Sequence, residues 1–229
     1  QSGALGKIMR FTGTYDQDQL LDESLPITWR HINKLAGCGA LGDLGSHLLS
    51  ISQFIMGDIT KVNAVATTVF PKRPKSAGST EMVDVENEDI MTFMAEYANG
   101  AIGQIACSRV ATGRKNYLTY EIQGTKGSVR YDLERMGEVQ VYFQSDNERD
   151  RGFRTVLLNP LMKGYSAFQP AGGISIAYND MKILEVHALF DAITNGADYV
   201  TDFEFGYKID RTVAAVIESS KTHEWVDVK

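Results

Sequence analysis

Asp43 and His47 stand four residues apart at the end of a glycine-rich stretch, residues 37–47, which reads Gly-Cys-Gly-Ala-Leu-Gly-Asp-Leu-Gly-Ser-His. In an α-helix, side chains at positions i and i+4 lie on one face, one turn apart. A histidine beside a carboxylate can accept and return a proton near neutral pH. The spacing therefore predicts a candidate acid–base pair on one side of a helix.

Two other interpretations of this pair remain open from the spacing alone. The first is a structural pair at a helix start, where the helix dipole favours a carboxylate such as Asp43, and short motifs often match by chance. The second is a pair of metal ligands. No third ligand follows at a suitable spacing, and the nearest other histidine, His31, precedes the glycine-rich turn. We therefore expect no metal site.

The apolar pattern around the pair predicts a helix over residues 40–56. Its apolar side chains recur at three- and four-residue steps, as expected for a face that packs on a core. We expect this stripe to comprise Leu41, Leu44, Leu48, Ile51 and Ile55.

The rest of the chain alternates like strands and then turns helical. We expect strands at 7–15, 59–70, 89–97, 101–110, 117–123, 128–133, 139–143 and 153–158, and an edge strand at 225–228. Loops are expected at 71–87 and 159–174, and helices at 175–194 and 205–220. The first of these helices has a predicted core stripe of Ile183, Val186, Phe190 and Ile193. Hairpin-linked strands with separate helices indicate an α+β fold. We expect a single domain, residues 1–229, with a large, mostly antiparallel open sheet and helices on one face.

Composition excludes several classes of protein. The net charge of −6 leaves no basic face for nucleic acid. No apolar run reaches the roughly 18 residues that a membrane span requires. The two cysteines, Cys38 and Cys107, make no disulfide framework, and we expect reduced packing residues in a cytoplasmic protein.

Several motifs occur in a characteristic order along the chain. Trp29-Arg30 precedes the glycine run and Asp43-x-Gly45-x-His47, and Gly57 follows the helix. Later segments, 113–116 and 121–128, read Gly-Arg-Lys-Asn and Glu-Ile-Gln-Gly-Thr-Lys-Gly-Ser. In this order the chain resembles the second, substrate-binding domain of the Gfo/Idh/MocA family of NAD(P)-dependent oxidoreductases. The resemblance covers nearly the whole chain and implies a fold like the C-terminal domain of glyceraldehyde-3-phosphate dehydrogenase. Cys38 is a small departure, because many relatives have glycine there.

The family's first domain, a Rossmann unit, is not recognisable here. No Gly-x-Gly-x-x-Gly follows a strand, and the pairs Pro71-Lys72 and Pro74-Lys75 reverse the family's catalytic Lys-Pro. The chain also begins with Gln1. We interpret it as a C-terminal piece of a longer enzyme, which should fold alone but show no dehydrogenase activity.

The resemblance implies hydride transfer between NAD or NADP and a carbinol carbon of a sugar, a cyclitol such as inositol, or a related polyol. His47 would accept and return the hydroxyl proton, and Asp43 would orient His47 or bind a neighbouring hydroxyl. The candidate substrate-binding residues are Tyr15, Asp16, Trp29, Arg30 and Tyr178. Each also has an ordinary structural interpretation, as a packed, turn or surface side chain.

The sheet and the family resemblance also predict an assembly. Alternate positions of the segment 90–94 are apolar on both sides, and exposed apolar sheet faces are typical of interfaces. Relatives commonly dimerise through this sheet, so we expect a homodimer or homotetramer. Two alternatives to a dehydrogenase stay open: a non-catalytic sensor of sugars or nucleotides on the same fold, and an NAD-dependent glycosidase of the same superfamily.

Overall fold

The computed structural model describes residues 3–162 and 164–229; residues 1, 2 and 163, which belong to the predicted domain and loop, lie outside the description. The main strands fall close to their expected places. They are β1 (Ile8–Asp16), β2 (Ile59–Thr67), β5 (Ile90–Tyr97), β6 (Ile102–Ser108), β7 (Tyr117–Gly124), β8 (Gly127–Asp132), β9 (Glu138–Phe143), β10 (Arg154–Leu157) and β11 (Val226–Asp227).

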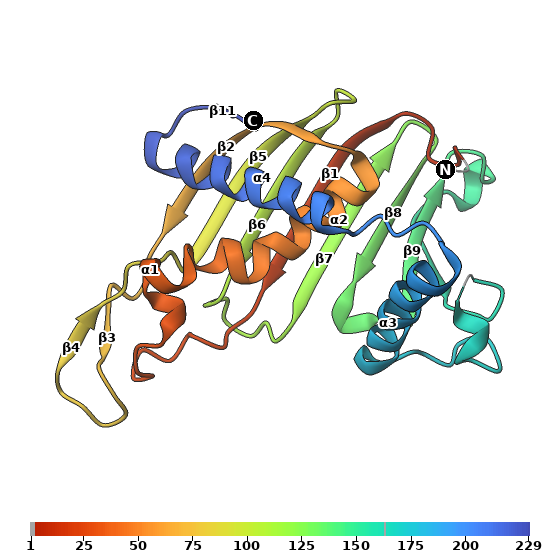
Figure 1. Cartoon of the computed structure of the whole chain (residues 1–229). Coiled ribbons are helices and arrows are strands. Elements are labelled where there is room, and N and C mark those ends of the chain that lie inside the picture. The colour runs from red at the N-terminus through yellow and green to blue at the C-terminus, as the bar shows by residue number, and fades with distance from the viewer. Residues whose placement is uncertain (1–2, 163) are drawn as a thin grey trace.

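In the described part of the chain these nine strands form one open sheet, in the order β10-β9-β8-β7-β1-β6-β5-β2-β11 (Figure 1). Every neighbouring pair is antiparallel except β1 and β6, which are parallel. The predicted α+β fold with a large, mostly antiparallel sheet is therefore confirmed.

The position of β1 determines where the ends of the central strands meet. The strand lies between β6 and β7, with Tyr15 paired to Cys107 on one side and to Leu118 on the other. Because β6 runs with β1 while β5 and β7 run against it, one edge of the sheet holds the ends of β1 and β6 and the starts of β5 and β7. We call this the catalytic edge of the sheet, after the candidate acid–base pair Asp43 and His47 that lies beside it.

Two helices, α2 (Ser46–Met56) and α4 (Phe203–Thr222), cover one face of the sheet (Figure 1). The core between them is apolar and includes Phe11, Leu48, Phe93 and Ile105. The Gln53 side-chain amide of α2 donates to the Thr212 hydroxyl of α4 (3.1 Å) and joins the two helices, and the backbone amide of Ala64 in β2 donates to Ser219 Oγ (2.9 Å) and joins α4 to the sheet. These two bonds satisfy buried polar groups that would otherwise destabilise the core.

The opposite, outer sheet face carries a mixed surface. Along β5, Met91, Phe93, Ala95 and Tyr97 are buried against the helices, and Thr92, Met94 and Glu96 point the other way. Three exposed apolar side chains, Val65, Met94 and Ile102, lie on this face. Around them are mainly threonine, glutamine and charged residues, so the face is less apolar than the sequence suggests. We define the outer sheet face by Arg10, Thr12, Val65, Met94, Ile102, Gln104, Glu121 and Arg130.

The start of the predicted helix 40–56 is not regular α-helix. Residues Leu41–Gly45 form a single π-helical turn, η2, and α2 continues from Ser46. The stripe Leu41, Leu44 and Leu48 is buried as expected, with Ile51 partly buried. Ile55 was expected in the core and is exposed, because the wider turn and the end of the helix rotate it away from the sheet.

The helix α3 (Tyr178–Asn195) begins three residues later than expected and is not a core helix. Its predicted core stripe of Ile183, Val186, Phe190 and Ile193 is 50% to 70% exposed, and His187 is exposed as well. The helix stands at the end of the sheet that carries β8 and β9, away from α2 and α4 (Figure 1). The periodicity was that of an amphipathic helix, but the apolar face has no cover among the described residues.

The predicted loop 71–87 contains a small hairpin of β3 (Lys72–Pro74) and β4 (Met82–Asp84), which projects beyond the sheet (Figure 1). Its proline and serine content concealed this pairing. The short helix α1 (Asn33–Ala36) follows the 3₁₀ turn η1 (Trp29–His31) on the same side of the molecule. Within the described residues no helix is both long and apolar enough to cross a bilayer, and both cysteines are free.

Candidate functional site

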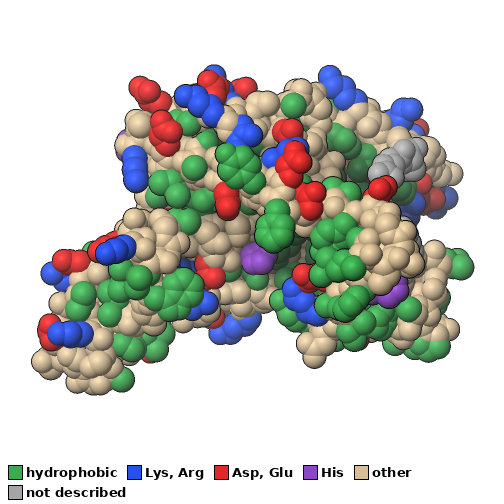
Figure 2. Space-filling model, in the orientation of Figure 1, with side chains coloured by type: hydrophobic (Ala, Val, Ile, Leu, Met, Phe, Trp, Pro, Cys, Tyr) green, Lys and Arg blue, Asp and Glu red, His purple; other side chains and the backbone are tan. Residues whose placement is uncertain are grey.

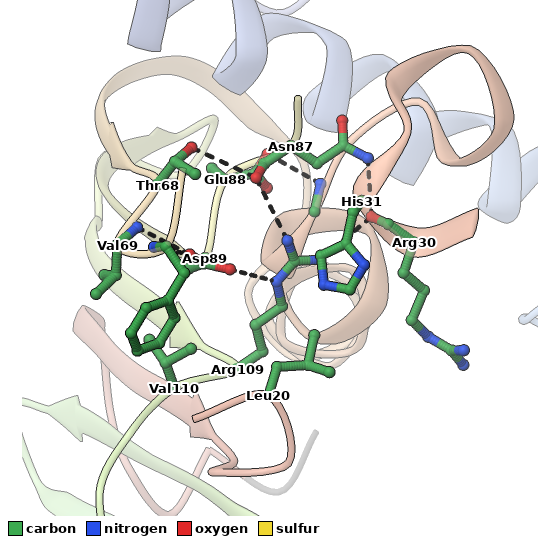
Figure 3. A network of polar contacts seen from close by, with 12 residues as sticks. Leu20, Arg30, His31, Thr68, Val69, Asn87, Glu88, Asp89, Arg109 and Val110 are labelled. Atoms are coloured by element: carbon green, nitrogen blue, oxygen red, sulfur yellow. Dashed lines mark hydrogen bonds and ion pairs between the residues drawn. The ribbon is translucent and has the colours of Figure 1, made fainter. Parts of the chain in front are cut away.

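Four consecutive polar residues before β5, Glu86-Asn87-Glu88-Asp89, hold the segment that leads to Asp43 and His47 (Figure 3). The carboxylate of Glu88 accepts hydrogen bonds from the backbone amides of Gly39 and Leu41, both at 2.9 Å. Glu88 therefore caps the N-terminus of the helix that carries the candidate pair, although it lies 49 residues away along the chain. A carboxylate at this position also interacts favourably with the helix dipole.

The backbones of Gly39 and Glu88 touch at this point. The amide of Ala40 donates to the carbonyl oxygen of Glu88 at 3.0 Å. A Cβ atom on residue 39 would overlap that same carbonyl oxygen. Gly39 is thus required by close backbone approach and not by an unusual dihedral angle.

A buried ion pair fixes the base of the same segment. Asp89 and Arg109 are both fully buried, and Arg109 Nε donates to Asp89 Oδ1 at 2.9 Å. The other carboxylate oxygen of Asp89 accepts the amides of Val69 and Phe70, at 2.8 and 3.1 Å. Because both charges have hydrogen-bond partners, burial does not leave either uncompensated.

The network continues from Arg109 to Arg30. Arg109 Nη1 and the Asn87 amide both donate to the backbone carbonyl of Arg30, at 3.3 and 2.9 Å. The side chain of Arg30 points away from this network (Figure 3). Its Nε lies 3.4 Å from Asp43 Oδ2, close enough for an ion pair but not a well-formed hydrogen bond. The guanidinium also lies over the Trp29 ring, 4.6 Å from its centroid.

His47 lies one helical turn beyond Asp43 and packs edge-on against Tyr15, with ring centroids 5.8 Å apart. Burial lowers the pKa of His47, the Asp43 carboxylate opposes that shift, and the Lys182 ammonium adds to it. The net direction is downward, which favours the neutral imidazole, the form that can accept a proton. In the described structure no hydrogen bond joins Asp43 to His47, and Asp43 acts on the histidine through its charge.

Two hollows flank the first turns of the helix. One, of about 490 Å³, is lined by Ser46, His47 and Ser50 of α2 and by the start of α4. The other, of about 190 Å³, is lined by Asp43 together with Trp29, Arg30 and the glycine run. Figure 2 shows hydrophobic side chains gathered on this face of the molecule, on both sides of a central hollow. Asp43 and His47 therefore face open space and not the core.

The structure brings most of the sequence-predicted site residues together. Tyr15, Arg30, Asp43 and His47 are linked by the contacts above, and Trp29 borders the smaller hollow. Burial raises the pKa of Tyr15, the hydrogen bond from Gln17 opposes this shift, and Tyr178 and Asp43 add smaller upward contributions. Tyr178, half exposed at the first turn of α3, is therefore near enough to influence Tyr15 electrostatically.

Asp16 is the exception among the candidates. Adjacent residues in a strand point to opposite faces, and Tyr15 points toward the helices. The Asp16 carboxylate instead accepts a hydrogen bond from the Thr14 hydroxyl (3.0 Å), whose side chain lines the outer sheet face. The structure thus separates Asp16 from the other candidate residues.

The sequence assigned no site role to Gln17, Glu88 or Lys182 in this region, and it indicated Asn116 only as part of the polar segment 113–116. Gln17 and Asn116 bind the Tyr15 hydroxyl, Glu88 caps the helix, and Lys182 influences the pKa of His47. Glu88, Asn116 and Lys182 come from segments far from the groups they act on, so no local spacing could reveal them. A usable signal was present for Glu88, because the run Glu-Asn-Glu-Asp stands directly before an apolar strand.

The arrangement is suited to proton transfer at a substrate hydroxyl. The imidazole of His47 faces a hollow, and the Asp43 carboxylate, paired with Arg30, stands one helical turn away. The Tyr15 ring packs edge-on against the imidazole and restricts its orientation. Among the described residues no three His, Cys, Asp or Glu side chains are arranged to hold a metal ion.

Comparison with known proteins places the chain in a family. The family model described as "GFO/IDH/MocA C-terminal domain" matches residues 1–130. A levoglucosan dehydrogenase of Pseudarthrobacter phenanthrenivorans is 39% identical over 241 residues. That alignment covers the whole of this chain and 61% of the relative, so the chain spans about three fifths of the length of that enzyme.

Solved structures agree with the sequence comparison. Levoglucosan dehydrogenase in complex with NADH and levoglucosan superposes with a TM-score of 0.94 at 39% identity, covering 99% of this chain and 60% of that one. The complex of that enzyme with NADH and L-sorbose gives 0.95. A protein described as an NAD binding oxidoreductase from Klebsiella pneumoniae gives 0.94, also at 39% identity and over the same shares of the two chains.

Replacing Gly39 with alanine should destabilise the fold by about 1–3 kcal/mol, because the new methyl group overlaps the Glu88 carbonyl and neither backbone can move without breaking the helix cap. Urea unfolding measures the change. Gly152→Ala is the matched control, since a Cβ at residue 152 meets no atom within 4 Å. Equal stability of the two variants would contradict the close approach.

Changing the charges around His47 should move its pKa in opposite directions. Asp43→Asn removes a carboxylate that favours the imidazolium and should lower the pKa, whereas Lys182→Met removes a repelling ammonium and should raise it. Titration of the His47 imidazole signals by NMR measures both shifts, with Lys221→Met on the distant end of α4 as the control. Shifts of the same sign in the two variants would contradict the positions of the Asp43 and Lys182 charges relative to His47.

Proposed function

Because this chain belongs to the GFO/IDH/MocA family, we propose that it forms the substrate-binding part of an NAD(P)-dependent dehydrogenase that oxidises a CH–OH group of a sugar, a cyclitol or a related polyol. The observation that carries this proposal is the position of His47, one turn from the Arg30-paired Asp43 and facing a hollow at the catalytic edge. The sugars bound by the similar levoglucosan dehydrogenase support a sugar as the substrate class.

In the proposed reaction His47 accepts the proton of the substrate hydroxyl while the carbinol hydrogen leaves as hydride. The proton must leave because a carbinol is a poor hydride donor until its oxygen gains negative charge. NAD or NADP, when bound, supplies the hydride acceptor. Asp43 stabilises the imidazolium that forms, and Arg30 pairs with the Asp43 carboxylate and holds it in place.

The residues of this chain leave room for a nicotinamide next to His47. The 490 Å³ hollow is open and flanked by exposed aromatic side chains at the start of α4, among them Phe203 and Tyr207. Asp202 is the N-cap of α4, and its carboxylate accepts the Phe205 amide at 2.9 Å, so this wall of the hollow is ordered. The phosphates need a glycine-rich turn that is not recognisable in this sequence.

We therefore propose that a dinucleotide-binding domain of the same protein packs on the helix-bearing face. The start of α4 lines the His47 hollow, and the exposed apolar side of α3 supplies a second apolar surface. Exposed apolar area of this extent is unusual on an isolated domain. Such packing would bring a cofactor to His47 and exclude water from the reacting atoms.

We also propose that the outer sheet face, on the opposite side, joins two copies of the chain. Around its three exposed apolar residues, Val65, Met94 and Ile102, it carries charges of both signs, including Arg10 and Glu121. A two-fold axis through the face can bring arginines of one copy to glutamates of the other. The active hollow stays free in such a dimer, because it lies on the other side of the sheet.

The direct test is turnover. The complete enzyme should reduce NAD or NADP with levoglucosan or another sugar or polyol of a panel, and His47→Ala should lower kcat by about 100- to 10,000-fold, the usual contribution of a general base. His223→Asn is the control, since asparagine tolerates the left-handed backbone at this exposed position. Sugar binding without turnover in the wild type would instead favour a sensor, and release of a glycosidic alcohol would favour a glycosidase.

The acid limb of the pH profile should follow His47. The histidine must be neutral to accept a proton, and its pKa lies below the usual value, so oxidation should persist to a more acidic pH than an unperturbed histidine allows. Asp43→Asn should displace this limb further toward low pH. A limb that stays in place in this variant, measured as kcat/KM against pH, would assign the limb to another group.

The assembly has its own test. Met94→Asp places a charge in the centre of the outer sheet face and should convert dimers to monomers in analytical ultracentrifugation. Leu161→Asp, at a residue that is 97% exposed in a loop, is the control and should leave the mass unchanged. A wild-type protein that sediments as a monomer would refute the proposed interface.

A further inference from the structure

The hydroxyl of Tyr15 belongs to a hydrogen-bond network of three side chains at the catalytic edge. Tyr15 Oη donates to Asn116 Oδ1 at 2.7 Å. The Gln17 amide Nε2 donates to the same Asn116 oxygen at 2.8 Å and to Tyr15 Oη at 3.3 Å. Tyr15 lies near the end of β1, Gln17 follows directly after that strand, and Asn116 stands just before β7, 101 residues from Tyr15.

Counting donors and acceptors shows what the network leaves free. Asn116 Oδ1 accepts two hydrogen bonds and is saturated, and Tyr15 Oη both donates and accepts. Among the described residues neither Asn116 Nδ2 nor Gln17 Oε1 has a hydrogen-bond partner. The network therefore presents two N–H donors and one carbonyl acceptor, and their carboxamides are oriented by the bonds they already make.

The backbone that carries Asn116 is well anchored. The amides of Lys115 and Asn116 both donate to Glu134 Oε1, at 3.2 and 3.0 Å. The Lys115 ammonium pairs with Asp18 at 2.6 Å, and the Arg114 guanidinium lies 3.5 Å from the centre of the Tyr117 ring. Sugar-binding groups that are held in advance lose little entropy on binding.

The backbone of Gln17 is fixed as well. Its amide donates to the Ser108 carbonyl at 2.8 Å, and its carbonyl accepts the Ala111 amide at 2.9 Å. These bonds extend the pairing of β1 and β6 by one step beyond the ends of both strands. Both free carboxamide groups are consequently carried by rigid parts of the sheet edge.

We propose that Asn116 and Gln17 form a hydroxyl-reading subsite that binds a sugar hydroxyl other than the one oxidised, next to the Tyr15–His47 ring pair. A sugar hydroxyl both donates and accepts, and so matches an N–H donor beside a carbonyl acceptor. The His47 and Tyr15 rings, 5.8 Å apart, separate the reacting hydroxyl from the one that is read. The inference rests on the proposed dehydrogenase function and adds a determinant of its specificity.

A purely structural role for Asn116, holding Tyr15 in place, makes a different prediction. If the residue only supports Tyr15, its loss should lower kcat/KM by the same factor for every sugar. If Asn116 binds a substrate hydroxyl, its loss should lower kcat/KM for sugars that have this hydroxyl and not for the analogue that lacks it. The two roles are therefore separable by a cycle of enzyme and substrate changes.

The experiment measures kcat/KM of the complete enzyme for levoglucosan and its 2-deoxy and 4-deoxy derivatives, or for the corresponding derivatives of whichever panel sugar the wild type oxidises best. The wild type should prefer the parent sugar to one deoxy analogue by about 10- to 100-fold, the effect of leaving a polar group of the site unpaired. Asn116→Leu should reduce that preference to near unity. Gln17→Leu, which removes the second carboxamide, should reduce it in part.

Gln140→Leu, a matched change on β9 away from the catalytic edge, should keep the wild-type preference. Each variant is checked by thermal unfolding, and Gln17→Leu preserves the test if Asn116→Leu does not fold. Equal losses for parent and deoxy sugars in both variants would overturn the subsite. A wild type that oxidises no sugar would refute the proposed function, whereas a wild type with no preference between parent and analogues would refute the subsite alone.

Discussion

The contact between Gly39 and Glu88 is the constraint on which the rest of the site depends. At this point a helix start and the start of a sheet strand approach so closely that no side chain fits between their backbones. The Glu88 carboxylate then satisfies two amides that would otherwise lack partners at the helix N-terminus. One residue thus sets the position of the helix against the sheet, and with it the positions of Asp43 and His47.

The neighbours of Glu88 extend the same principle to the other elements. Asn87 and the buried Arg109 hold the backbone of Arg30, whose side chain pairs with Asp43. Asp89 forms an ion pair with Arg109 in the core, so the buried guanidinium that holds the backbone of Arg30 is not left without a counter-charge. The buried network around Arg109 therefore fixes the catalytic edge on its core side, while the surface around His47 stays open.

The two surfaces of the sheet have different characters for a physical reason. The inner face packs against α2 and α4, and its alternate positions are uniformly apolar. The outer face mixes apolar and charged groups and so remains compatible with water. The exposed apolar side of α3 forms a third surface, at the end of the sheet that carries β8 and β9.

Sequence alone determined the class of fold, most strand positions and the candidate pair, because these depend on local periodicity and on a short motif. It also brought Tyr15, Trp29, Arg30 and Tyr178 into consideration, although their substrate contacts remain predictions. Tertiary structure alone decided the π turn before α2, the exposure of α3 and Ile55, the capping of the helix by Glu88, and the meeting of Tyr15 with Asn116. The last two depend on pairings between residues 49 and 101 positions apart, whose partners are chosen by the order of strands and not by neighbouring residues.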